Sequence, residues 1–466
     1  MNTTETVSHK KEVQEFLSPA PLRSFIGGEW IASTWAKTFD TVDPGTGAVL
    51  AKVYEADAKE VDAAIGAATQ AFRKKGWAEL PPGERAAYLH RLADLVEARA
   101  TVIAEIESLD VGKPLAQAQG DVQNFSQTVR YYADLSVHAS YREQIAVPRH
   151  EARTVHQPRG VCGFIFPWNF PFLLVGWGIA PALAAGNTVV IKPAEETPLS
   201  TLYLMQLVQE VGIPDGVVNV VPGSGEITGA ALARHPGLAM MSFTGSPEVG
   251  RLVARECGQN LVPVKLELGG KGAAVVFEDA DMEATVEALV GAITLNAGQV
   301  CCTASRWIVQ QSIYDRFSAL AVSRMKQLRI GYGHEADTQM GPVVSEKQRD
   351  RVLGYLAKAR EQGAELILGG GVADVPGRER GYYVKPAVIA GEAGNVACRE
   401  EIFGPVPFLL RFRDEQEAVE LVNRSAYGLA NSVWSRDLNR ANRVAERMVA
   451  GNSWINAHNV FVHGVP

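Results

Sequence analysis

The chain carries no charged residue between Arg159 and Lys192, although this stretch is rich in large apolar side chains. Its length would permit a membrane-spanning helix. Prolines and glycines interrupt it throughout, however, so a continuous helix of spanning length is disfavoured. The pattern predicts instead a buried strand over 161–166, a loop over 167–171, a buried helix over about 173–186 and a second buried strand over 187–191.

Helical and strand patterns alternate along most of the remaining chain. One helical face is formed by Val61, Ile65, Ala68 and Phe72, and further strands are expected over 217–223, 240–243, 262–267 and 273–277. A second alternating series follows Cys301, with strands over 306–311, 365–370 and 430–435 and helices near 312–328, 344–362 and 437–449. Such βαβα alternation predicts two α/β domains, each with a parallel sheet covered by helices, and a site in the cleft between them.

Residues 133–158 fit neither series. They read as strands that leave the main body, in the manner of a small hairpin arm. The divisions we expect are an α/β domain over 20–132 and 159–266, a second α/β domain over 267–452, the arm over 133–158, and a returning segment over 453–466.

Composition narrows the classes of partner. The 466 residues have a net charge of -7 with scattered lysines and arginines, which argues against nucleic acid and against anionic membranes and favours small molecules or other proteins. The polar N-terminus lacks the apolar core of an export signal. Five cysteines are an odd, sparse set that fits free thiols in a reducing cytoplasm better than disulfides.

Two glycine-rich turns stand where strands give way to helices. One contains Gly223, Gly225 and Gly229, and the other contains Gly245 and Gly250. Glycines allow a phosphate to approach the backbone at a helix N-terminus. Neither turn has the standard dinucleotide-binding spacing, and tight packing of helix on strand is the alternative interpretation of each.

Two carboxylates are placed at strand ends. Glu195 follows an apolar strand together with Lys192, so the pair could bind a ribose and a phosphate, or could be a solvated surface pair. Glu267 precedes Gly269 and Gly270, which suits a buried general base. The alternative is a surface glutamate paired with a neighbouring lysine.

The segment "NAGQVCCTASR" places Cys301 and Cys302 side by side. No histidine lies near them, and no histidines pair with cysteines at metal-ligand spacing, so no metal site is expected. A nucleophilic thiolate would need stabilisation by backbone N–H groups, a cofactor or a distant partner. Two inert core cysteines are the alternative.

Six motifs in order resemble the NAD(P)-dependent aldehyde dehydrogenase superfamily. They are "FPWNFP" (166–171), "IKPAEETPLS" (191–200), "FTGSPEVGR" (243–251), "LELGGK" (266–271), "NAGQVC" (296–301) and "EEIFGPV" (400–406). The resemblance extends from about residue 24 to the last residue. It implies a modified Rossmann cofactor domain, a second α/β catalytic domain and a small β oligomerisation arm.

The resemblance also implies roles for individual residues. Cys301 is the expected nucleophile, Glu267 the general base and Asn169 the donor to the oxyanion. Lys192 and Glu195 are expected to hold the adenosine ribose, Ser246 to contact the pyrophosphate, and Glu401 and Phe403 to position the nicotinamide ribose and ring. The other positions expected to line the cofactor are Ile165, Trp168, Gly225, Phe243, Gly245 and Leu268.

On this resemblance the chain oxidises an aldehyde through a thiohemiacetal and a thioester on Cys301, which water activated by Glu267 then hydrolyses. The presence of Glu267 favours the free acid as product over transfer to coenzyme A. Glu195 favours NAD, because its carboxylate would repel a 2′-phosphate, although NADP remains an alternative. The resemblance also implies a homodimer or homotetramer for the full-length form.

The expected substrate residues are Phe170, Trp177, Cys302 and Phe461, with Asn124 and His458 as further candidates. Aromatic side chains without a positive residue favour an apolar, aromatic or betaine-type aldehyde, and core packing is the alternative for Trp177. We expect Cys302 to face a different wall from Cys301. The family continues beyond the equivalent of Pro466 with a C-terminal strand, so the outer tunnel wall and the subunit contact are expected to be incomplete here.

Two rival functions remain. A non-catalytic relative would keep the fold without turnover, but the set of Cys301, Glu267 and Asn169 argues against it. A cofactor-free cysteine hydrolase or acyltransferase is opposed by the motifs around Lys192, Glu195 and Ser246.

Overall fold

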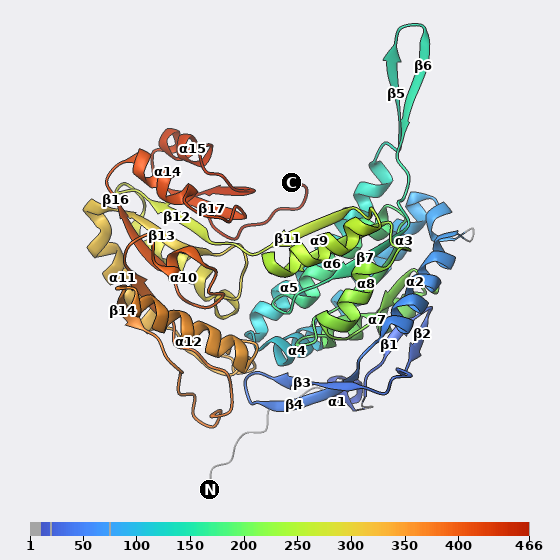
Figure 1. Ribbon diagram of the computed structural model, residues 1–466, viewed down its shortest axis with the longest axis horizontal. Helices are drawn as coiled ribbons and strands as arrows, with labels where there is room; N and C mark the ends of the chain where they lie inside the picture. The colour runs from blue at the N-terminus through green and yellow to red at the C-terminus, as the bar shows by residue number, and fades with distance from the viewer. Residues whose placement is uncertain (1–10, 19–20, 74–75, 466) are drawn as a thin grey trace.

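The computed structural model describes residues 11–18, 21–73 and 76–465, and it consists of two lobes, each built on a seven-stranded sheet (Figure 1). Most of the polar segment that we examined for an export signal, residues 1–10, lies outside these ranges. In the described part of the chain, no helix combines the length and the apolar character that crossing a bilayer requires.

The first sheet contains the uncharged stretch that opened the sequence analysis. Its strands, in spatial order, are β11 (Val264–Leu268), β10 (Met240–Gly245), β7 (Val161–Ile165), β8 (Thr188–Lys192), β9 (Val218–Val220), β1 (Ser24–Ile26) and β2 (Glu29–Ile31). The five strands from β11 to β9 are parallel, as predicted. An antiparallel β1–β2 hairpin, which was not predicted, closes the other edge.

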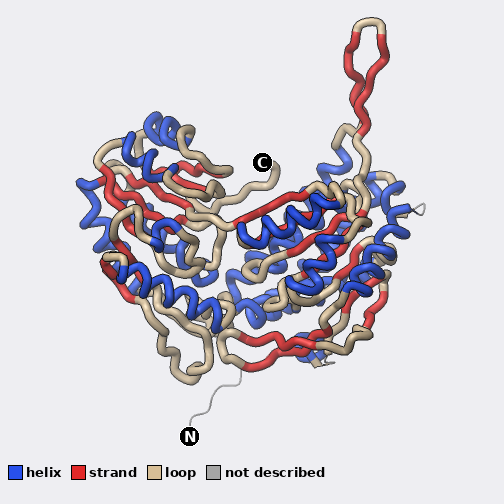
Figure 2. The backbone as a smooth tube through the Cα atoms, viewed as in Figure 1, coloured by secondary structure: helices blue, strands red, loops and turns tan. Residues whose placement is uncertain are grey.

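Helices cover both faces of this sheet (Figure 2). The helices of this lobe are α1 (Lys11–Leu17), α2 (Ala58–Arg73), α3 (Pro82–Ala98), α4 (Ala100–Val111), α5 (Leu115–His138), α6 (Pro171–Ala184), α7 (Leu199–Val211), α8 (Ala230–Arg234) and α9 (Pro247–Gln259). Alternate residues of β7 enter two cores: Cys162 and Phe164 join the core of α3 to α7, while Val161 and Ile165 join that of α2, α8 and α9. Burial on both faces explains why this strand reads as a continuous apolar run.

Two smaller strands complete the lobe's border. β3 (Thr38–Asp43) and β4 (Ala48–Tyr54) form a separate antiparallel pair. A short 3₁₀ turn over Trp77–Glu79 leads into α3.

The second sheet repeats the α/β pattern. Its strands, in spatial order, are β14 (Glu365–Gly369), β15 (Ala387–Ala390), β16 (Phe408–Phe412), β13 (Ala304–Gln310), β12 (Gly272–Val276), β17 (Ala430–Trp434) and β18 (Asn452–Ile455). All neighbours are parallel except β14 and β15. The helices are α10 (Met282–Thr294), α11 (Tyr314–Lys326), α12 (Glu346–Glu361), α13 (Val396–Arg399), α14 (Glu415–Asn423) and α15 (Leu438–Ala445).

The two sheets are joined directly, because only residues 269–271 separate β11 from β12. The boundary that we propose between residues 266 and 267 therefore falls within β11. The proposed returning segment, 453–466, begins inside β18, so its first residues continue the second sheet.

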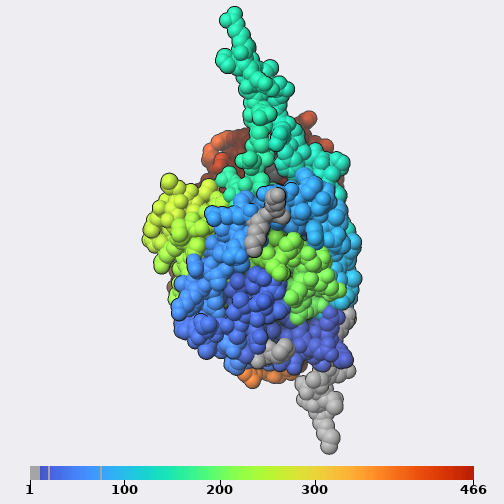
Figure 3. Space-filling view, turned by 90° about the vertical axis from the view of Figure 1, so that its right-hand side faces the viewer, coloured from blue at the N-terminus to red at the C-terminus, as the bar shows by residue number. Residues whose placement is uncertain are grey.

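A two-stranded hairpin, β5 (Arg142–Val147) with β6 (His150–Val155), projects from the first lobe (Figures 1 and 3). The predicted arm of 133–158 is wrong at its N-terminal end, because α5 continues to His138. The helix continues there because Val129, Ala133 and Ser136 keep one buried helical face.

Candidate active site

Parallel strands of the first sheet bring the candidate residues to one edge. Ile165 is in register with Lys192 and with Phe243, and Gly245 is in register with Leu268. The loops after these strand ends carry Asn169, Glu195 and Ser246, and Glu267 is the penultimate residue of β11. Ligands of open α/β sheets bind at this carboxyl edge.

The residues predicted to hold the adenosine ribose form a paired group. Lys192 Nζ lies 2.9 Å from Glu195 Oε2, and the Gly225 N–H donates to Glu195 Oε1 at 3.4 Å. Partial burial would raise the pKa of Glu195, but the Lys192 ammonium and these hydrogen bonds hold it below its ordinary value. Glu195 is therefore an ionised acceptor, and the space beside Gly225 is open, since a Cβ there would meet no atom within 4 Å.

The glycine-rich turns adopt two different structures. The first continues as a π-helical turn over Gly225–Gly229 before the short α8, which explains why its glycine spacing departs from the standard fingerprint. The second leads into α9, where the Ser246 hydroxyl accepts a hydrogen bond from Val249 N at 3.2 Å. The exposed Ser246 thus lies at the N-terminus of a 13-residue helix, where anions are stabilised.

Residues from the second lobe face this edge. The Phe403 ring meets the Trp168 ring edge to face, with centroids 5.2 Å apart. Glu401 Oε1 accepts from Gly270 N at 3.0 Å. Burial raises the pKa of Glu401, against the opposing effect of this hydrogen bond. The structure therefore brings Glu401 and Phe403 beside the connection between the two sheets.

The segment before Cys301 is held in an unusual conformation. Asn296, Ala297 and Gly298 all have positive φ angles, of 47°, 53° and 76°. Asn169 fixes this turn from the first lobe, because its Nδ2 donates to Gln299 O at 2.9 Å and its backbone oxygen accepts from Asn296 Nδ2 at 2.8 Å. An amide nitrogen has two hydrogens, so the buried Asn169 side chain keeps a second N–H for a ligand.

Glycine is required where this segment touches its neighbours. A Cβ on Gly270 would lie 2.2 Å from Cys301 O, and a Cβ on Gly298 would lie 2.2 Å from Gly404 C. Both contacts are with backbone, which cannot rotate away.

We expect Gly270→Ala to displace the Cys301 peptide, to destabilise the protein by about 1 to 3 kcal/mol, and to abolish most activity. Thermal unfolding and a turnover assay would measure both effects. Gly291→Ala is the matched control, because Gly291 lies in α10 and a Cβ there meets nothing within 4 Å. Equal activity of the two variants would contradict the close approach at Gly270.

The two cysteines influence each other's ionisation. The neighbouring Cys302 thiol holds the pKa of Cys301 below its ordinary value, against the opposing effects of burial and of the Glu401 charge. The same interaction raises the pKa of Cys302 well above its ordinary value. Residues 301–303 form a turn, and the Cys302 thiol lies 3.4 Å from Asn459 Oδ1. The expectation that the two thiols face different walls stays a prediction.

Glu267 differs from the buried base that we expected. Its side chain is 46% exposed, and its Oε1 lies 3.2 Å from Lys265 Nζ. Residues of β11 form the sheet edge and are only partly buried, which explains the exposure. In this conformation Glu267 is a surface glutamate paired with Lys265, which was the alternative interpretation of the sequence.

Two of the expected substrate residues, Trp177 and Phe461, lie in contact, and the other two, Phe170 and Cys302, lie in an apolar cluster. Trp177 Nε1 donates to Asn124 Oδ1 at 2.8 Å, and the Trp177 ring lies 5.5 Å from the Phe461 ring. Trp454, which we did not predict, lies 5.5 Å from Phe461. Phe170 and Trp454 pack against the apolar cluster that contains Cys302 and contacts Cys301. Trp177 is only partly buried, so it is not a residue of the hydrophobic core.

A buried charged group beside Phe170 was also not predicted from the sequence. Lys113 Nζ bonds Glu107 Oε1 at 3.2 Å and Asp121 Oδ2 at 2.6 Å, and lies 4.3 Å from the centroid of the Phe170 ring. Burial opposes ionisation, but the two carboxylates raise the pKa of Lys113, so it stays charged. A lysine in the apolar "DVGKPLA" segment was the available signal.

Comparisons with known proteins agree with this geometry. The family model described as "Aldehyde dehydrogenase family" matches residues 30–466. The mitochondrial aldehyde dehydrogenase of Homo sapiens is 42% identical over 441 residues, which cover 94% of this chain and 84% of the human one. An aldehyde dehydrogenase of Emericella nidulans is 41% identical over 448 residues, covering 96% and 89%.

Solved structures give the same result. Betaine aldehyde dehydrogenase from Staphylococcus aureus, in complex with NAD+, is 35% identical and superposes with a TM-score of 0.95 over 98% of this chain and 91% of that one. A variant of an aldehyde dehydrogenase from Bacillus cereus is 39% identical, with a TM-score of 0.96 over 98% and 93%. The motifs, the two-lobed fold and these matches together show that the chain belongs to the aldehyde dehydrogenase family.

Proposed function

We propose that this protein oxidises an aldehyde to the carboxylic acid with NAD+, through covalent intermediates on Cys301. One observation carries the proposal. The thiol whose pKa is lowered, Cys301, lies in a turn that the buried amide of Asn169 holds against the edge carrying Lys192 and Glu195. As a family member with this edge intact, the chain is an NAD-dependent aldehyde dehydrogenase.

The residues at the edge fit a dinucleotide. Glu195 presents carboxylate oxygens for ribose hydroxyls, Lys192 supplies a cation, and the N-terminus of α9 with Ser246 suits the pyrophosphate. Bound NAD+ supplies the hydride acceptor. Because the carboxylate of Glu195 is ionised and would repel a 2′-phosphate, we propose a preference for NAD over NADP.

In the acylation half-reaction, the Cys301 thiolate adds to the aldehyde carbon. The second N–H of Asn169 and the backbone N–H of Cys301 are the proposed donors to the oxyanion. Collapse of the tetrahedral thiohemiacetal expels hydride from the same carbon and leaves a thioester on Cys301. Glu401 and Phe403 are the proposed contacts of the nicotinamide ribose and ring, and Trp168 packs against Phe403.

In deacylation, Glu267 is the proposed base that removes a proton from the attacking water. To do so, its carboxylate leaves the exposed contact with Lys265. Such surface ion pairs contribute only about 0 to 1 kcal/mol, so the movement is energetically accessible.

We expect Glu267→Gln to acylate normally and to stall at the thioester, because the amide cannot accept the proton from water. Stopped-flow absorbance of NADH would show a burst equal to the active sites, followed by a slow phase. Lys265→Gln is the control, since it removes the ion pair and keeps the base. An unchanged steady-state rate in Glu267→Gln would refute the role of base.

The substrate that we propose is an apolar, aromatic or betaine-type aldehyde. Trp177, Phe461, Trp454 and Phe170 supply an aromatic wall near Cys301. The charged Lys113 is paired with two carboxylates behind Phe170, so it offers no free cation for an acidic semialdehyde.

We further propose that the protein is a homodimer or homotetramer and acts in the cytoplasm. The projecting hairpin supports the first proposal, because Ile145, Val147 and Val155 are exposed apolar residues on a two-stranded sheet with free edges. The small number of cysteines, none of which forms a disulfide with another in the described residues, supports the second.

The direct test is absorbance of NADH during incubation with a panel of aldehydes, with NAD+ and NADP+ in parallel. Turnover with apolar, aromatic or betaine-type aldehydes and NAD+ is the expected result. Saturable NAD+ binding without turnover on any aldehyde would favour the rival, a non-catalytic relative.

A further inference from the structure

His458 is buried beside the nucleophile turn, and both of its ring nitrogens are hydrogen-bonded. Its Nε2 lies 2.9 Å from Cys302 O, and its Nδ1 lies 3.0 Å from Ser432 Oγ. We had expected this side chain to line the substrate pocket. Its imidazole instead reaches the backbone of the residue that follows Cys301.

The partners determine which nitrogen carries the proton. A carbonyl oxygen can only accept, so Nε2 carries the hydrogen and donates to Cys302 O. Nδ1 then accepts from the Ser432 hydroxyl, whose oxygen in turn accepts from Trp434 Nε1 at 3.0 Å. Burial lowers the pKa of His458 to about 4, so the ring is neutral at physiological pH. The result is a directional chain from Trp434 to the Cys302 carbonyl.

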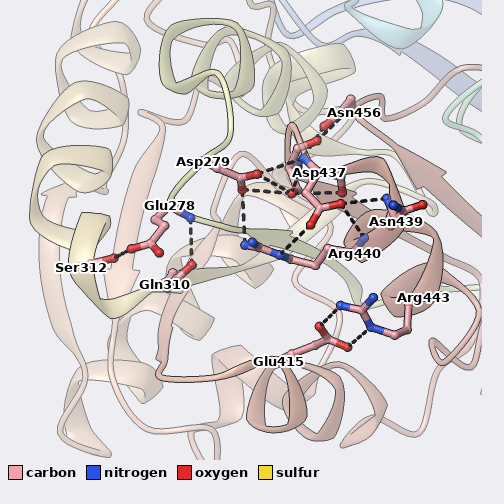
Figure 4. A network of polar contacts seen from close by, with 11 residues as sticks. Glu278, Asp279, Gln310, Ser312, Glu415, Asp437, Asn439, Arg440, Arg443 and Asn456 are labelled. Atoms are coloured by element: carbon pink, nitrogen blue, oxygen red, sulfur yellow. Dashed lines mark hydrogen bonds and ion pairs between the residues drawn. The ribbon is translucent and has the colours of Figure 1, made fainter.

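The segment that carries His458 is itself anchored. Asn456 Oδ1 accepts from Ser435 N at 3.0 Å, and Asn456 Nδ2 donates to Ser435 O at 2.9 Å. Figure 4 shows Asn456 at the border of the polar network formed by Asp279, Asp437 and Arg440. The end of β17 and the turn after β18 are thereby joined, which fixes the position from which His458 reaches Cys302.

The neighbouring residue makes a second contact with the same cysteine. The Cys302 thiol lies 3.4 Å from Asn459 Oδ1. Cys302 is therefore held at its carbonyl by His458 and at its sulfur by Asn459. His458 and Asn459 lie more than 150 residues after Cys302 in the sequence.

We propose that His458 is a positioning residue: by fixing the Cys302 peptide, it directs the Cys302 thiol toward Cys301 and so stabilises the reactive thiolate. This inference rests on the proposed role of Cys301. The Cys302 thiol bonds to Asn459 Oδ1 in the structure. We expect it to turn to Cys301 when that residue is a thiolate, which is the stronger acceptor, and to stay with Asn459 when Cys301 is acylated.

The test compares His458→Phe, which keeps a ring of similar size and removes both hydrogen bonds, with His458→Gln, whose amide can still donate to Cys302 O. The pH dependence of alkylation by iodoacetamide is measured on each protein, and fragmentation of the tryptic peptide 272–306 assigns the alkylated cysteine. The other titratable groups acting on Cys301 are Cys302 and Glu401. His90→Gln, on a surface pair with Asp134, is the control.

In His458→Phe we expect the alkylation midpoint of Cys301 to rise by about one pH unit, which corresponds to an approximately tenfold lower rate near neutral pH. The value of kcat falls while KM for NAD+ stays unchanged, and His458→Gln restores most of the thiolate. Ser432→Ala shifts the profile in the same direction by less, and provides the test should His458→Phe fail to fold.

A folded His458→Phe or Ser432→Ala protein with the wild-type alkylation profile would overturn the proposal. So would an equal loss of kcat in His458→Phe and His458→Gln without any change in that profile, because this pattern indicates a general structural role. The alkylation measurement requires no aldehyde turnover. Failure of the proposed function would appear differently: the wild-type protein would form no NADH with any aldehyde, while His458→Phe would still shift the alkylation profile of Cys301.

Discussion

Asn169→Ala is expected to lower kcat by about 10² to 10³, the usual effect of losing one oxyanion donor. The Asn169 side chain is 3% exposed and spends one N–H on Gln299 O, which leaves the second for the developing alkoxide. Binding of NAD+ should persist, because Lys192 lies in β8 and Glu195 and Ser246 lie on loops other than that of Asn169. Steady-state kinetics and titration of NAD+ by fluorescence would measure the two effects separately.

The control for this variant is Asn423→Ala. The Asn423 side chain also hydrogen-bonds to backbone groups: its Nδ2 donates to Arg447 O and its Oδ1 accepts from Val449 N. Asn423 is exposed and belongs to α14 in the second lobe. Its loss should leave kcat near the wild-type value. Near-normal turnover of a folded Asn169→Ala protein would show that the oxyanion donor lies elsewhere.

Cys301→Ser is expected to lose a factor on the order of 10⁴ to 10⁶ in kcat, as is usual when a covalent nucleophile is removed. A serine hydroxyl is much less acidic than the cysteine thiol. A hydrogen bond from Cys302 is too weak to convert the serine hydroxyl into an alkoxide. The measurement is NADH formation at saturating aldehyde and NAD+.

Cys302→Ser is the matched substitution one residue away. It keeps a donor toward Cys301, so the reactive thiolate should survive and turnover should be retained. Loss of turnover in Cys302→Ser, together with activity in Cys301→Ser, would assign the nucleophile to the other cysteine.

Much of the first sheet could be predicted from sequence because its signals are local. The apolar run between Arg159 and Lys192 could not be exposed, and its prolines and glycines divide it into a strand, a helix and a strand; the structure has β7, α6 and β8 there. Since the carboxyl ends of parallel strands meet at one edge, the loops carrying Asn169, Glu195 and Ser246 could also be expected to lie together.

Other elements gave no comparable signal. β15 and β16 are mostly apolar segments of four and five residues, too short to be distinguished from pieces of helix. β16 pairs with β13, about 100 residues earlier in the sequence, and β15 pairs with β16, so their identity as strands depends on partners outside their own segment. The antiparallel hairpin of β1 and β2 is defined in the same way, by its contact with β9.

The site shows the same division. Local motifs identify the residue types, but the exposure of Glu267 follows from the position of β11 at the sheet edge. The effect of Cys302 on the pKa of Cys301 could not be predicted either, because it depends on the turn at 301–303. The contacts of His458 with Cys302, and of Lys113 with Phe170, join segments that only the tertiary fold brings together.

The most direct test of the account is to locate the acyl group. Glu267→Gln protein is mixed with NAD+ and an aldehyde that the wild type oxidises, then quenched in acid after the NADH burst and digested with trypsin. Mass spectrometry of peptide 272–306 should show the acyl mass on Cys301, in an amount equal to the NADH formed. An NADH burst with an unmodified Cys301, or with the acyl group on Cys302, would contradict the proposed mechanism.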